Sequence, residues 1–369
     1  MKDENRPVGQ TSRLSDIEKA SRLSWRSEEE EMSGEQYPGE KIDIFCHVIP
    51  PKYKEALFKK ATGSSFYLAN THRVPALTSL EARFRVMDQY EGLRQVLNLG
   101  APPLEHVLAP KDAAEAARIA NDEMAELVNR YPDRFVAAVA CLPYNDLDAA
   151  LQELERALGD LGLRGIQIFS SINGKPLDRP EFLAIYERMA HYDLPILIHP
   201  ARDYTIPDYP DEPHSRYDLF RIFAWPFETT LAMSRLVFSG IMEQYPAIKF
   251  IAHHCGAMLP FFAGRVPKGP TAESQGGDLM RLSRPPLDYF RKFYADTNVD
   301  GNVAALMCGH AFFGTDNMVF ASDYPYPGGA EKGHLALGEV IRSVELINLP
   351  REELTRIFSG NAKRIMNIS

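Results

Sequence analysis

Residues 195–200 have the sequence PILIHP, in which a short apolar run ends in a histidine that a proline follows. A run this short and this apolar is typical of a parallel strand that other elements cover on both faces. Residues 248–254, with the sequence IKFIAHH, repeat the pattern and end in two histidines. Because an ionisable group in such a strand needs a polar partner, both stretches predict a parallel sheet with a polar site at its strand ends.

The same kind of run occurs eight times and alternates with segments of helical spacing, which predicts βαβ units. The runs are 41–47, 93–99, 135–141, 165–169, 195–199, 248–254, 293–297 and 318–323. The helical segments are 79–90, 111–130, 147–158, 179–191, 229–244, 302–313, 335–344 and 351–365. Eight of each predict an α/β fold, a (β/α)8 TIM barrel with long βα loops. A doubly wound sheet is the alternative, but its glycine-rich phosphate-binding turn is missing after the first run.

Composition excludes several classes of protein. The 369 residues are 45% hydrophobic and carry a formal net charge of −9 without a basic block, which argues against nucleic-acid binding. No apolar run approaches the ~18 residues that a membrane helix needs, and the polar N-terminus lacks the features of a signal peptide. The four cysteines form no CxxC pair, so we expect reduced thiols in a cytoplasmic protein.

Residues 1–40 differ in character from the rest of the chain. They are polar, contain the acidic run Glu28–Glu31 and show no clean apolar helix face. We therefore expect a flexible N-terminal arm, followed by one barrel domain over residues 41–369. The alternative is an arm that packs on a partner subunit through Trp25, and a homodimer is the expected assembly.

The predicted strand ends concentrate ionisable residues. The first run ends in His47, the fifth in His199, the sixth in His253 and His254, and the eighth in Asp323. Active sites of such barrels lie at the C-terminal ends of the strands, and imidazoles with a carboxylate are common ligands of divalent metal ions. We therefore expect one divalent ion at the barrel mouth, zinc first and manganese or iron as alternatives, and no organic cofactor.

Residues near these ends extend the candidate site. Asp296, in the seventh run, and Glu228 are candidates for binding a second metal ion. The aromatic-rich loop after the fifth run, which includes Trp225, is either ordinary loop packing or a lid over a planar substrate. Arg202 in that loop is a candidate for pairing with a substrate carboxylate, and Gln167 in the fourth run is a further candidate for substrate contact.

Five short motifs occur in order along these runs. They are Ile42-Asp43-Ile44-Phe45-Cys46-His47, Gln167-Ile168 with Asn173-Gly174, Ile198-His199-Pro200, His254-Cys255-Gly256 with Pro260, and Ser322-Asp323-Tyr324-Pro325. On these motifs the chain resembles the amidohydrolase superfamily over nearly all of residues 41–369. The resemblance is to the branch that contains aminocarboxymuconate-semialdehyde decarboxylase and γ-resorcylate decarboxylase.

The resemblance implies roles for four of the residues. His47, His199 and Asp323 match metal ligands of the superfamily, and His254 matches the sixth-strand histidine that acts on the substrate or on metal-bound water. The spacing to the following glycine and proline favours His254 over His253 for this match. Strand alternation agrees, since neighbouring residues of a strand cannot both face the barrel axis.

One position departs from the family motif. Phe45 replaces the first histidine of the family's HxH pair, and a phenyl ring cannot bind a metal ion. Three consequences remain open: weaker or different coordination, a replacement ligand such as His253 or His254, or loss of the metal. No lysine lies near the end of the fourth run, so a carboxylated lysine that bridges two ions is not expected.

The resemblance implies a metal-dependent lyase that removes CO₂ without oxidation from a small aromatic or unsaturated carboxylic acid. His254 or Asp323 would manage the proton, and the metal would act as a Lewis acid. The same residues leave three alternatives open: a hydrolase that uses metal-activated water, an iron-dependent oxygenase, and a non-catalytic barrel that has lost its metal.

Overall fold

The structure is a computed structural model that describes residues 37–62, 68, 71, 73–100, 102–266, 282–326 and 329–368. Most of the predicted N-terminal arm, including Trp25, lies outside these residues, as does part of the loop between 255 and 292. From Tyr37 onward the chain is packed against the barrel: the Tyr37 side chain is 8% exposed and stacks on Phe358 at 4.7 Å between ring centroids.

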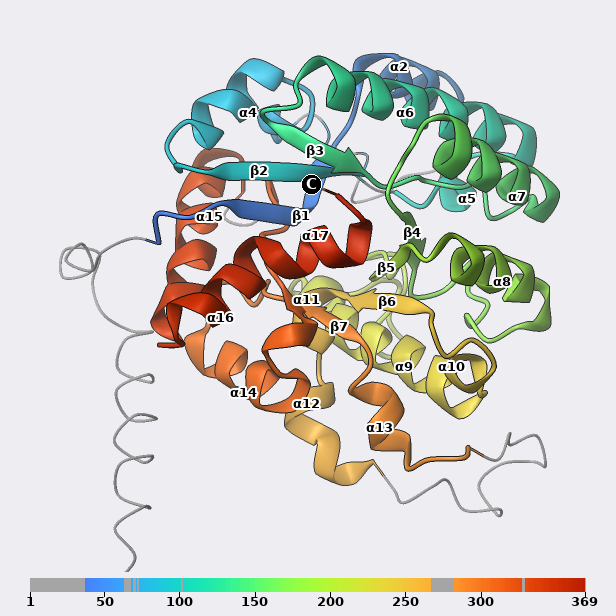
Figure 1. The fold of residues 1–369 in the computed structure, drawn as a ribbon. Coiled ribbons are helices and arrows are strands. Elements are labelled where there is room, and N and C mark those ends of the chain that lie inside the picture. The colour runs from blue at the N-terminus through green and yellow to red at the C-terminus, as the bar shows by residue number, and fades with distance from the viewer. Residues whose placement is uncertain are drawn as a thin grey trace, which may run out of the picture.

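Eight parallel strands follow one another in sequence order around the centre of the molecule (Figure 1). They are β1 (Lys41–Val48), β2 (Leu93–Leu99), β3 (Phe135–Ala138), β4 (Ile166–Phe169), β5 (Pro195–His199), β6 (Lys249–Ala252), β7 (Tyr294–Asp296) and β8 (Met318–Val319). They form one group of three, β1 to β3, and one group of five, β4 to β8.

Backbone hydrogen bonds close both gaps between the two groups. Between β3 and β4, the amide of Ala140 donates to the carbonyl of Gly165 and the amide of Gln167 donates to that of Ala140, both at 2.9 Å. Between β8 and β1, the amide of Ile44 donates to the carbonyl of Phe320 at 3.1 Å, and the amide of His47 to that of Tyr324 at 2.7 Å. The strands therefore form a closed ring, which confirms the predicted (β/α)8 barrel.

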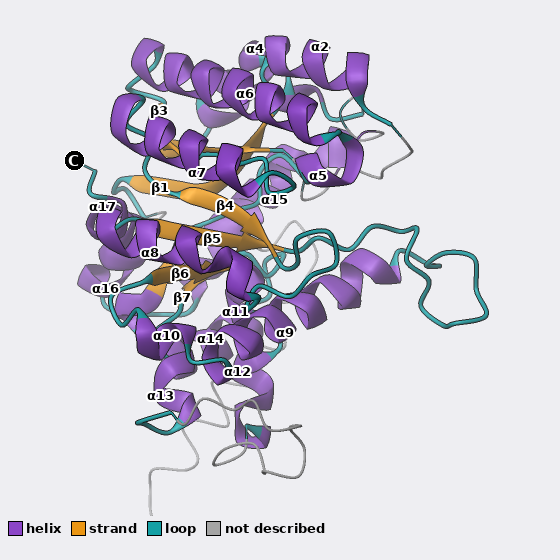
Figure 2. Ribbon diagram, turned by 90° about the vertical axis from the view of Figure 1, so that its right-hand side faces the viewer, coloured by secondary structure: helices purple, strands orange, loops and turns teal. Residues whose placement is uncertain are grey.

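Helices surround the strands on all sides (Figures 1 and 2). They are α2 (Pro51–Lys60), α4 (Leu80–Met87), α5 (Leu104–Val107), α6 (Pro110–Arg130), α7 (Leu147–Glu155), α8 (Leu183–Tyr192), α9 (Trp225–Phe238), α10 (Ile241–Gln244), α11 (His253–Gly256), α12 (Leu259–Phe262), α13 (Pro286–Phe290), α14 (Val303–Phe313), α15 (Gly329–Leu346), α16 (Arg351–Thr355) and α17 (Asn361–Met366). Ser79, Asp146 and Asn302 cap α4, α7 and α14 by accepting a hydrogen bond from a first-turn amide. None of the described helices is long and apolar enough to cross a membrane.

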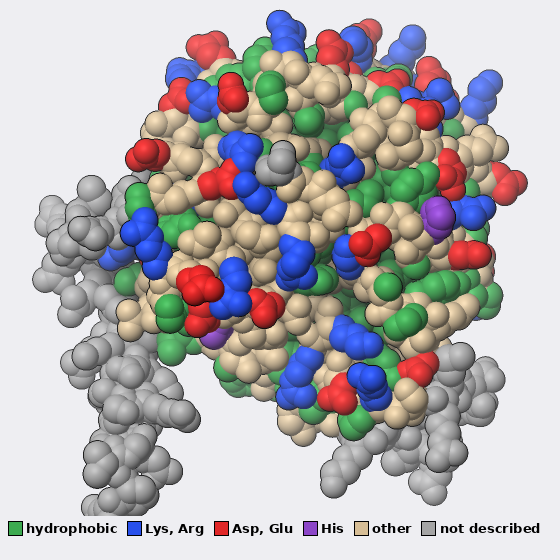
Figure 3. All heavy atoms as spheres, in the orientation of Figure 1, with side chains coloured by type: hydrophobic (Ala, Val, Ile, Leu, Met, Phe, Trp, Pro, Cys, Tyr) green, Lys and Arg blue, Asp and Glu red, His purple; other side chains and the backbone are tan. Residues whose placement is uncertain are grey.

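The barrel interior is filled by side chains that point inward from the strands. Ile42, Leu197, Ile251 and Val319 belong to this inner cluster, and α17 adds Ile365 and Met366 to it. The residues on the opposite faces of the same strands pack under the surrounding helices. On the outer surface, basic and acidic side chains are interspersed across the face that Figure 3 shows, as the composition predicts.

Four strands end earlier than the sequence pattern predicts, and two of them, β3 and β7, end at Ala138 and Asp296 rather than at residues 141 and 297. β6 ends at Ala252 rather than at residue 254, and β8 ends at Val319 rather than at residue 323. Beyond these ends the backbone leaves the sheet, because His254 and Asp323 adopt left-handed conformations with φ of 56° and 60°. These two residues therefore lie on turns at the barrel mouth, where strand alternation no longer determines which way a side chain points.

Candidate active site

Strand alternation and one bulge bring ionisable side chains to the barrel mouth. Along β5 and β6, Leu197 and Ile251 face the interior, so His199 and His253, two residues further on, also face it. In β1 the pairing register shifts between Asp43 and Cys46. This bulge changes the alternation, so that Phe45 joins the interior cluster and His47 follows it.

His47, His199 and Asp323 converge at the mouth. One donor atom from each lies within 4.8 Å of those of the other two. Nε2 of His47 is 2.8 Å from Oδ1 of Asp323, whose side chain is 13% exposed. Nδ1 of His199 donates to the carbonyl of Pro200 at 2.8 Å, which leaves the lone pair of this imidazole on Nε2. Two nitrogen donors and one carboxylate oxygen at this spacing fit a divalent metal ion.

His253, His254 and Asp323 form a second group with the same spacing. Nδ1 of His253 donates to Oδ2 of Asp296, and Nε2 of His253 lies 3.6 Å from Oδ1 of Asp323. The other oxygen of Asp296 accepts from the amides of Cys255 at 2.9 Å and Asn298 at 3.1 Å. Asp296 is thus committed to orienting His253, and it belongs to neither group of metal-capable donors.

The position of His254 differs from the expectation that only one of the two neighbouring histidines faces the site. Its ring centroid is 4.0 Å from that of His253, and both rings line the mouth. The physical reason is the early end of β6, because the left-handed backbone at His254 turns its ring back toward the preceding residue. The alternation of β6 therefore carries on to His253, the first residue after the strand, which faces inward, and the turn adds His254.

Burial and mutual charge set the protonation of this cluster. Burial, together with the neighbouring His47 and His253, lowers the pKa of His199 to about 3. Burial also lowers the pKa of His254 well below its ordinary value. Burial by itself would raise the pKa of Asp323, but the adjacent imidazoles of His253 and His47 hold it well below its usual range. His199 and His254 are therefore neutral near pH 7, and Asp323 is ionised.

Aromatic rings enclose the cluster. Phe45 lies beneath it, with its ring centroid 5.8 Å from that of His47 and 5.9 Å from that of His199. Trp225, at the start of α9, lies 6.2 Å from the ring of His199 and is nearly parallel to that of His254 at 6.5 Å. Phe169 packs with Trp225 in a small apolar cluster. These walls suit a planar, apolar group next to the metal-capable donors.

The remaining candidates have other partners in this structure. Glu228 accepts from the hydroxyl of Ser170 at 3.1 Å and from the amide of Arg202 at 3.0 Å, and it lies outside both metal-capable groups. Arg202 donates through Nη2 to the carbonyl of Pro207 at 2.7 Å. Both residues thus organise the loop after β5, and the carbonyl of Arg202 accepts from the indole of Trp225 at 2.8 Å.

Gln167 is buried on the inner face of β4, and its amide oxygen has no hydrogen-bond partner among the described residues. It lines a small cavity together with Phe169, which belongs to the site wall. The main-chain oxygen of Gln167 accepts from the hydroxyl of Tyr144 at 2.6 Å. Substrate contact by Gln167 stays a prediction.

Sequence reasoning missed the buried charges behind the site. Arg83 is fully buried and donates to the carbonyl of His47, to that of Ala76 at 3.2 Å and to the side chain of Gln95 at 2.7 Å. Asp43 accepts from the amide of Ser322 at 2.9 Å and from its hydroxyl. These bonds hold β1 and the turn after β8 in register, and thereby hold His47 and Asp323. The available signal was the helical spacing of Arg83 with Leu80 and Met87, which places a charge on the buried face of α4.

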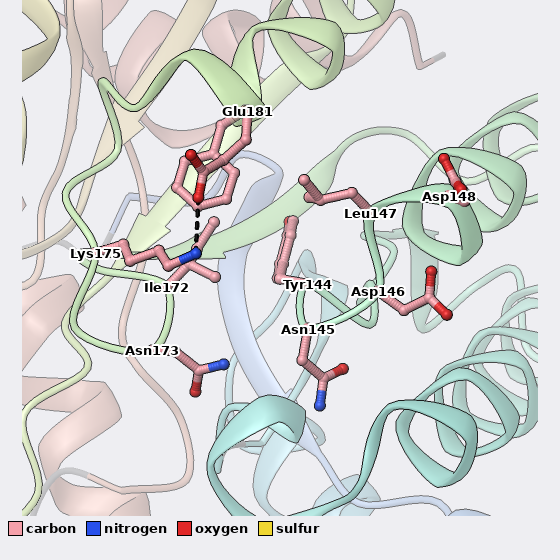
Figure 4. A pocket seen from close by; sticks show the side chains of 10 residues that line it. Tyr144, Asn145, Asp146, Leu147, Asp148, Ile172, Asn173, Lys175 and Glu181 are labelled. Atoms are coloured by element: carbon pink, nitrogen blue, oxygen red, sulfur yellow. Dashed lines mark hydrogen bonds and ion pairs between the residues drawn. The ribbon is translucent and has the colours of Figure 1, made fainter.

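A separate pocket of about 370 Å³ lies in the loops after β3 and β4 (Figure 4). Lys175 and Glu181 form an ion pair across one side of it at 2.8 Å, and the side chain of Asn145 donates to the carbonyl of Leu108 at 3.0 Å. The residues that line it include none of the clustered histidines. This pocket therefore lacks the groups that the expected chemistry needs.

A family model described as Amidohydrolase matches residues 42–368 of the chain, and several known proteins are similar to it. The 2-amino-3-carboxymuconate-6-semialdehyde decarboxylase of Dictyostelium discoideum is 28% identical over 345 residues, which cover 89% of this chain and 92% of that protein. The crystal structure of 5-carboxyvanillate decarboxylase from Sphingomonas paucimobilis has a TM-score of 0.73 and 26% identity, and covers 89% of this chain and 99% of the other. The dihydroxybenzoic acid decarboxylase from Polaromonas sp. JS666, solved with bound manganese and the inhibitor 2-nitroresorcinol, has a TM-score of 0.69 over 89% of this chain and 97% of the other. At 24% identity this last likeness supports the fold alone.

Proposed function

The chain belongs to the amidohydrolase family, and on that premise we propose that it is a metal-dependent decarboxylase of small aromatic or unsaturated carboxylic acids. The family predicted from the sequence motifs is thereby confirmed. The observation that carries the proposal is the convergence of His47, His199 and Asp323 within 4.8 Å of one another, under the ring of Trp225. The relatives named above are decarboxylases, which favours loss of CO₂ over the hydrolytic and oxygenating alternatives.

His47, His199 and Asp323 would hold the divalent ion. When bound, the ion supplies Lewis-acid stabilisation to the substrate carboxylate and a neighbouring oxygen. The imidazole-rich donor set supports zinc as the first choice, whereas the relative from Polaromonas is known with manganese. Metal analysis of protein purified without added metal decides between them.

The reaction breaks the bond between a ring carbon and the carboxylate carbon. The electron pair stays on the ring carbon, CO₂ leaves, and one proton is added to that carbon, so no oxidant or reductant is needed. Nδ1 of His254 is buried and has no hydrogen-bond partner among the described residues, and we assign the proton to this atom. Because burial lowers the pKa of His254, its imidazole is neutral near pH 7, so it would pass a proton taken up from water to the ring carbon rather than store one.

The aromatic walls orient the substrate. The indole of Trp225 donates a hydrogen bond to the carbonyl of Arg202, and this bond fixes the indole ring so that it faces the ring of His254. A planar acid packed on the wall formed by Trp225 and Phe169 would lie against the metal-capable donors and would exclude water from the reacting carbon. Gln167 would then meet a polar substituent of that ring.

Incubation with a panel of acids tests the function. The panel comprises 5-carboxyvanillate, a dihydroxybenzoic acid and 2-amino-3-carboxymuconate 6-semialdehyde, with released CO₂ and the decarboxylated product measured together. We expect stoichiometric CO₂ with at least one acid, and loss of activity after chelation that manganese or zinc restores. Metal-loaded protein that releases CO₂ from none of the three acids would contradict the proposal.

We also propose that the protein is a homodimer. The helix formed by η4 (Phe220–Ala224) and α9 extends away from the barrel, with the preceding loop at its far end (Figure 2). Ile206, Tyr209, Tyr217, Phe223 and Phe227 on this extension are exposed, and an exposed apolar surface of this kind supports association. Light scattering coupled to size exclusion measures the mass directly, and a monomer would contradict the proposal.

A further inference from the structure

We propose that His253 supplies the metal ligand that the first strand lacks at Phe45, so that three imidazoles and Asp323 hold the ion. The inference rests on the proposed function, because it assigns a ligand of that same metal site. It leaves His254 as the one clustered histidine that does not bind the ion.

The first observation is the position of the two rings. The imidazole of His253 stacks on the phenyl ring of Phe45 at 4.2 Å between centroids, with 21° between their planes. The same imidazole lies 5.4 Å from the ring of His199. Phe45 therefore lies among the clustered histidines but has no atom that can bind a metal ion. The imidazole of His253, which stacks on Phe45, has such an atom.

The second observation is how His253 is oriented. Its Nδ1 donates to Asp296, and that carboxylate is itself fixed by the amides of Cys255 and Asn298. Metal-binding histidines characteristically donate their other ring nitrogen to a carboxylate or carbonyl in this way, which fixes the tautomer and the ring. In the neutral imidazole, the proton that Asp296 holds on Nδ1 leaves the lone pair of His253 on Nε2, which faces the site.

The third observation is what Nε2 of His253 faces. This atom is buried without a hydrogen-bond partner among the described residues, and it lies 3.6 Å from Oδ1 of Asp323. The separation is too long for a good hydrogen bond. Two ligands that share an ion at ~2.0–2.1 Å each lie roughly 2.8–3.4 Å apart in octahedral or tetrahedral geometry. The same carboxylate oxygen is 2.8 Å from Nε2 of His47. A cation bound to Oδ1 would therefore give the buried nitrogen of His253 its missing partner.

Counting imidazole ligands on bound Mn²⁺ tests the inference without relying on turnover. Pulsed electron paramagnetic resonance of the Mn²⁺-loaded full chain should detect three coordinated imidazole nitrogens in the unmodified protein. In His253→Gln, whose amide can still donate to Asp296, the count should fall to two, and the Kd for Mn²⁺ should rise at least about 100-fold. Asp296→Asn should raise the Kd by a smaller factor, about 10–100-fold, because it only loosens the orientation.

Two further variants complete the design. His191→Gln changes an exposed histidine at the end of α8 and should leave the count and the Kd unchanged. Phe45→His combined with His253→Gln moves the imidazole to the first strand and should restore three nitrogens. A swap that stays at two nitrogens would show that His253 does not stand in for the position of Phe45.

The outcome that overturns the inference is a count of two in the unmodified protein, or a Kd that His253→Gln leaves unchanged. The number of imidazole nitrogens on Mn²⁺ in the unmodified protein tests the inference even if a variant fails to fold. Circular dichroism and thermal melting would reveal such a failure. Three nitrogens without CO₂ release from any acid would refute the proposed function and leave the ligand assignment standing.

Discussion

Nε2 of His47 lies 2.8 Å from Oδ1 of Asp323, so the first and the last strand of the barrel meet in one pair of side chains. The backbones meet at the same place, where the amide of His47 donates to the carbonyl of Tyr324 at 2.7 Å. The bonds that close the barrel and the atoms proposed to hold the ion therefore belong to the same few residues.

Asp323→Asn should remove most of the bound metal and abolish turnover. The change removes the anionic donor common to both groups of metal-capable side chains, and with it the charge that compensates the ion. Metal content of the purified variant, measured by mass spectrometry, checks the first effect, and CO₂ release checks the second. A variant that keeps a full complement of metal would exclude Asp323 as a ligand.

His254→Asn should reduce turnover by about 10²–10⁴-fold while the metal stays bound. The reason is that His254 is assigned to the proton rather than to the ion. Metal content and the rate of CO₂ release are to be measured on the same preparation. If the metal is lost as completely as in Asp323→Asn, His254 is a ligand and its assigned role is wrong.

Arg83→Met should destabilise the fold by about 3 kcal/mol or more. Three acceptors would lose a buried, charged donor, at a cost of about 1–3 kcal/mol each. Urea unfolding measures the change in the free energy of unfolding. Arg85→Met on the same helix is the matched control, because the side chain of Arg85 is 72% exposed and its change should stay within about 0.5 kcal/mol.

Glu105→Gln should stabilise the protein at pH 8 and hardly change it at pH 5. Burial raises the pKa of Glu105 from 4.5 to about 7, so the folded protein holds a proton that the unfolded chain releases near pH 4.5. Stability therefore falls as the pH rises from about 4.5 to about 7, and the full penalty, on the order of 2–3 kcal/mol, applies above that.

Thermal midpoints at both pH values check this prediction. Glu126→Gln is the control, because the side chain of Glu126 is 62% exposed and the substitution should shift neither midpoint appreciably. An equal gain from Glu105→Gln at both pH values would show that ionisation is not the cause.

Deletion of residues 1–36 should leave stability unchanged, whereas deletion of residues 1–40 should lower it by about 3 kcal/mol, as for loss of a buried aromatic side chain. The longer deletion removes Tyr37, whose hydroxyl donates to Thr355 at 2.8 Å, and Glu40, which pairs with Lys363 at 2.9 Å. Chemical denaturation of both truncated proteins distinguishes them. Equal stability of the two would place the whole of residues 1–40 in the accessory arm.

The barrel could be predicted from sequence because each strand is a short apolar run, and the site because the polar residues follow those runs. His199 shows both effects, since it ends the apolar run of β5 and faces inward by simple alternation. The two-residue period of strands thus determines which way a side chain points wherever the strand is regular.

The choice between His253 and His254 could not be made from sequence in the same way. Alternation was applied to a strand predicted to reach residue 254, but the strand ends at Ala252 and a left-handed turn follows. The bulge in β1 is a similar case, since it places Phe45 inside through a register shift that periodicity does not show. Turns and bulges depend on packing with distant strands, so a local pattern does not specify them.

His47 and Asp323 are 276 residues apart along the chain, and this has a consequence for how the enzyme is made. On the ribosome, the N-terminal donor emerges long before its partner has been synthesised. A nascent or prematurely terminated chain therefore contains imidazoles but no assembled site, so metal acquisition must follow translation of the last strand.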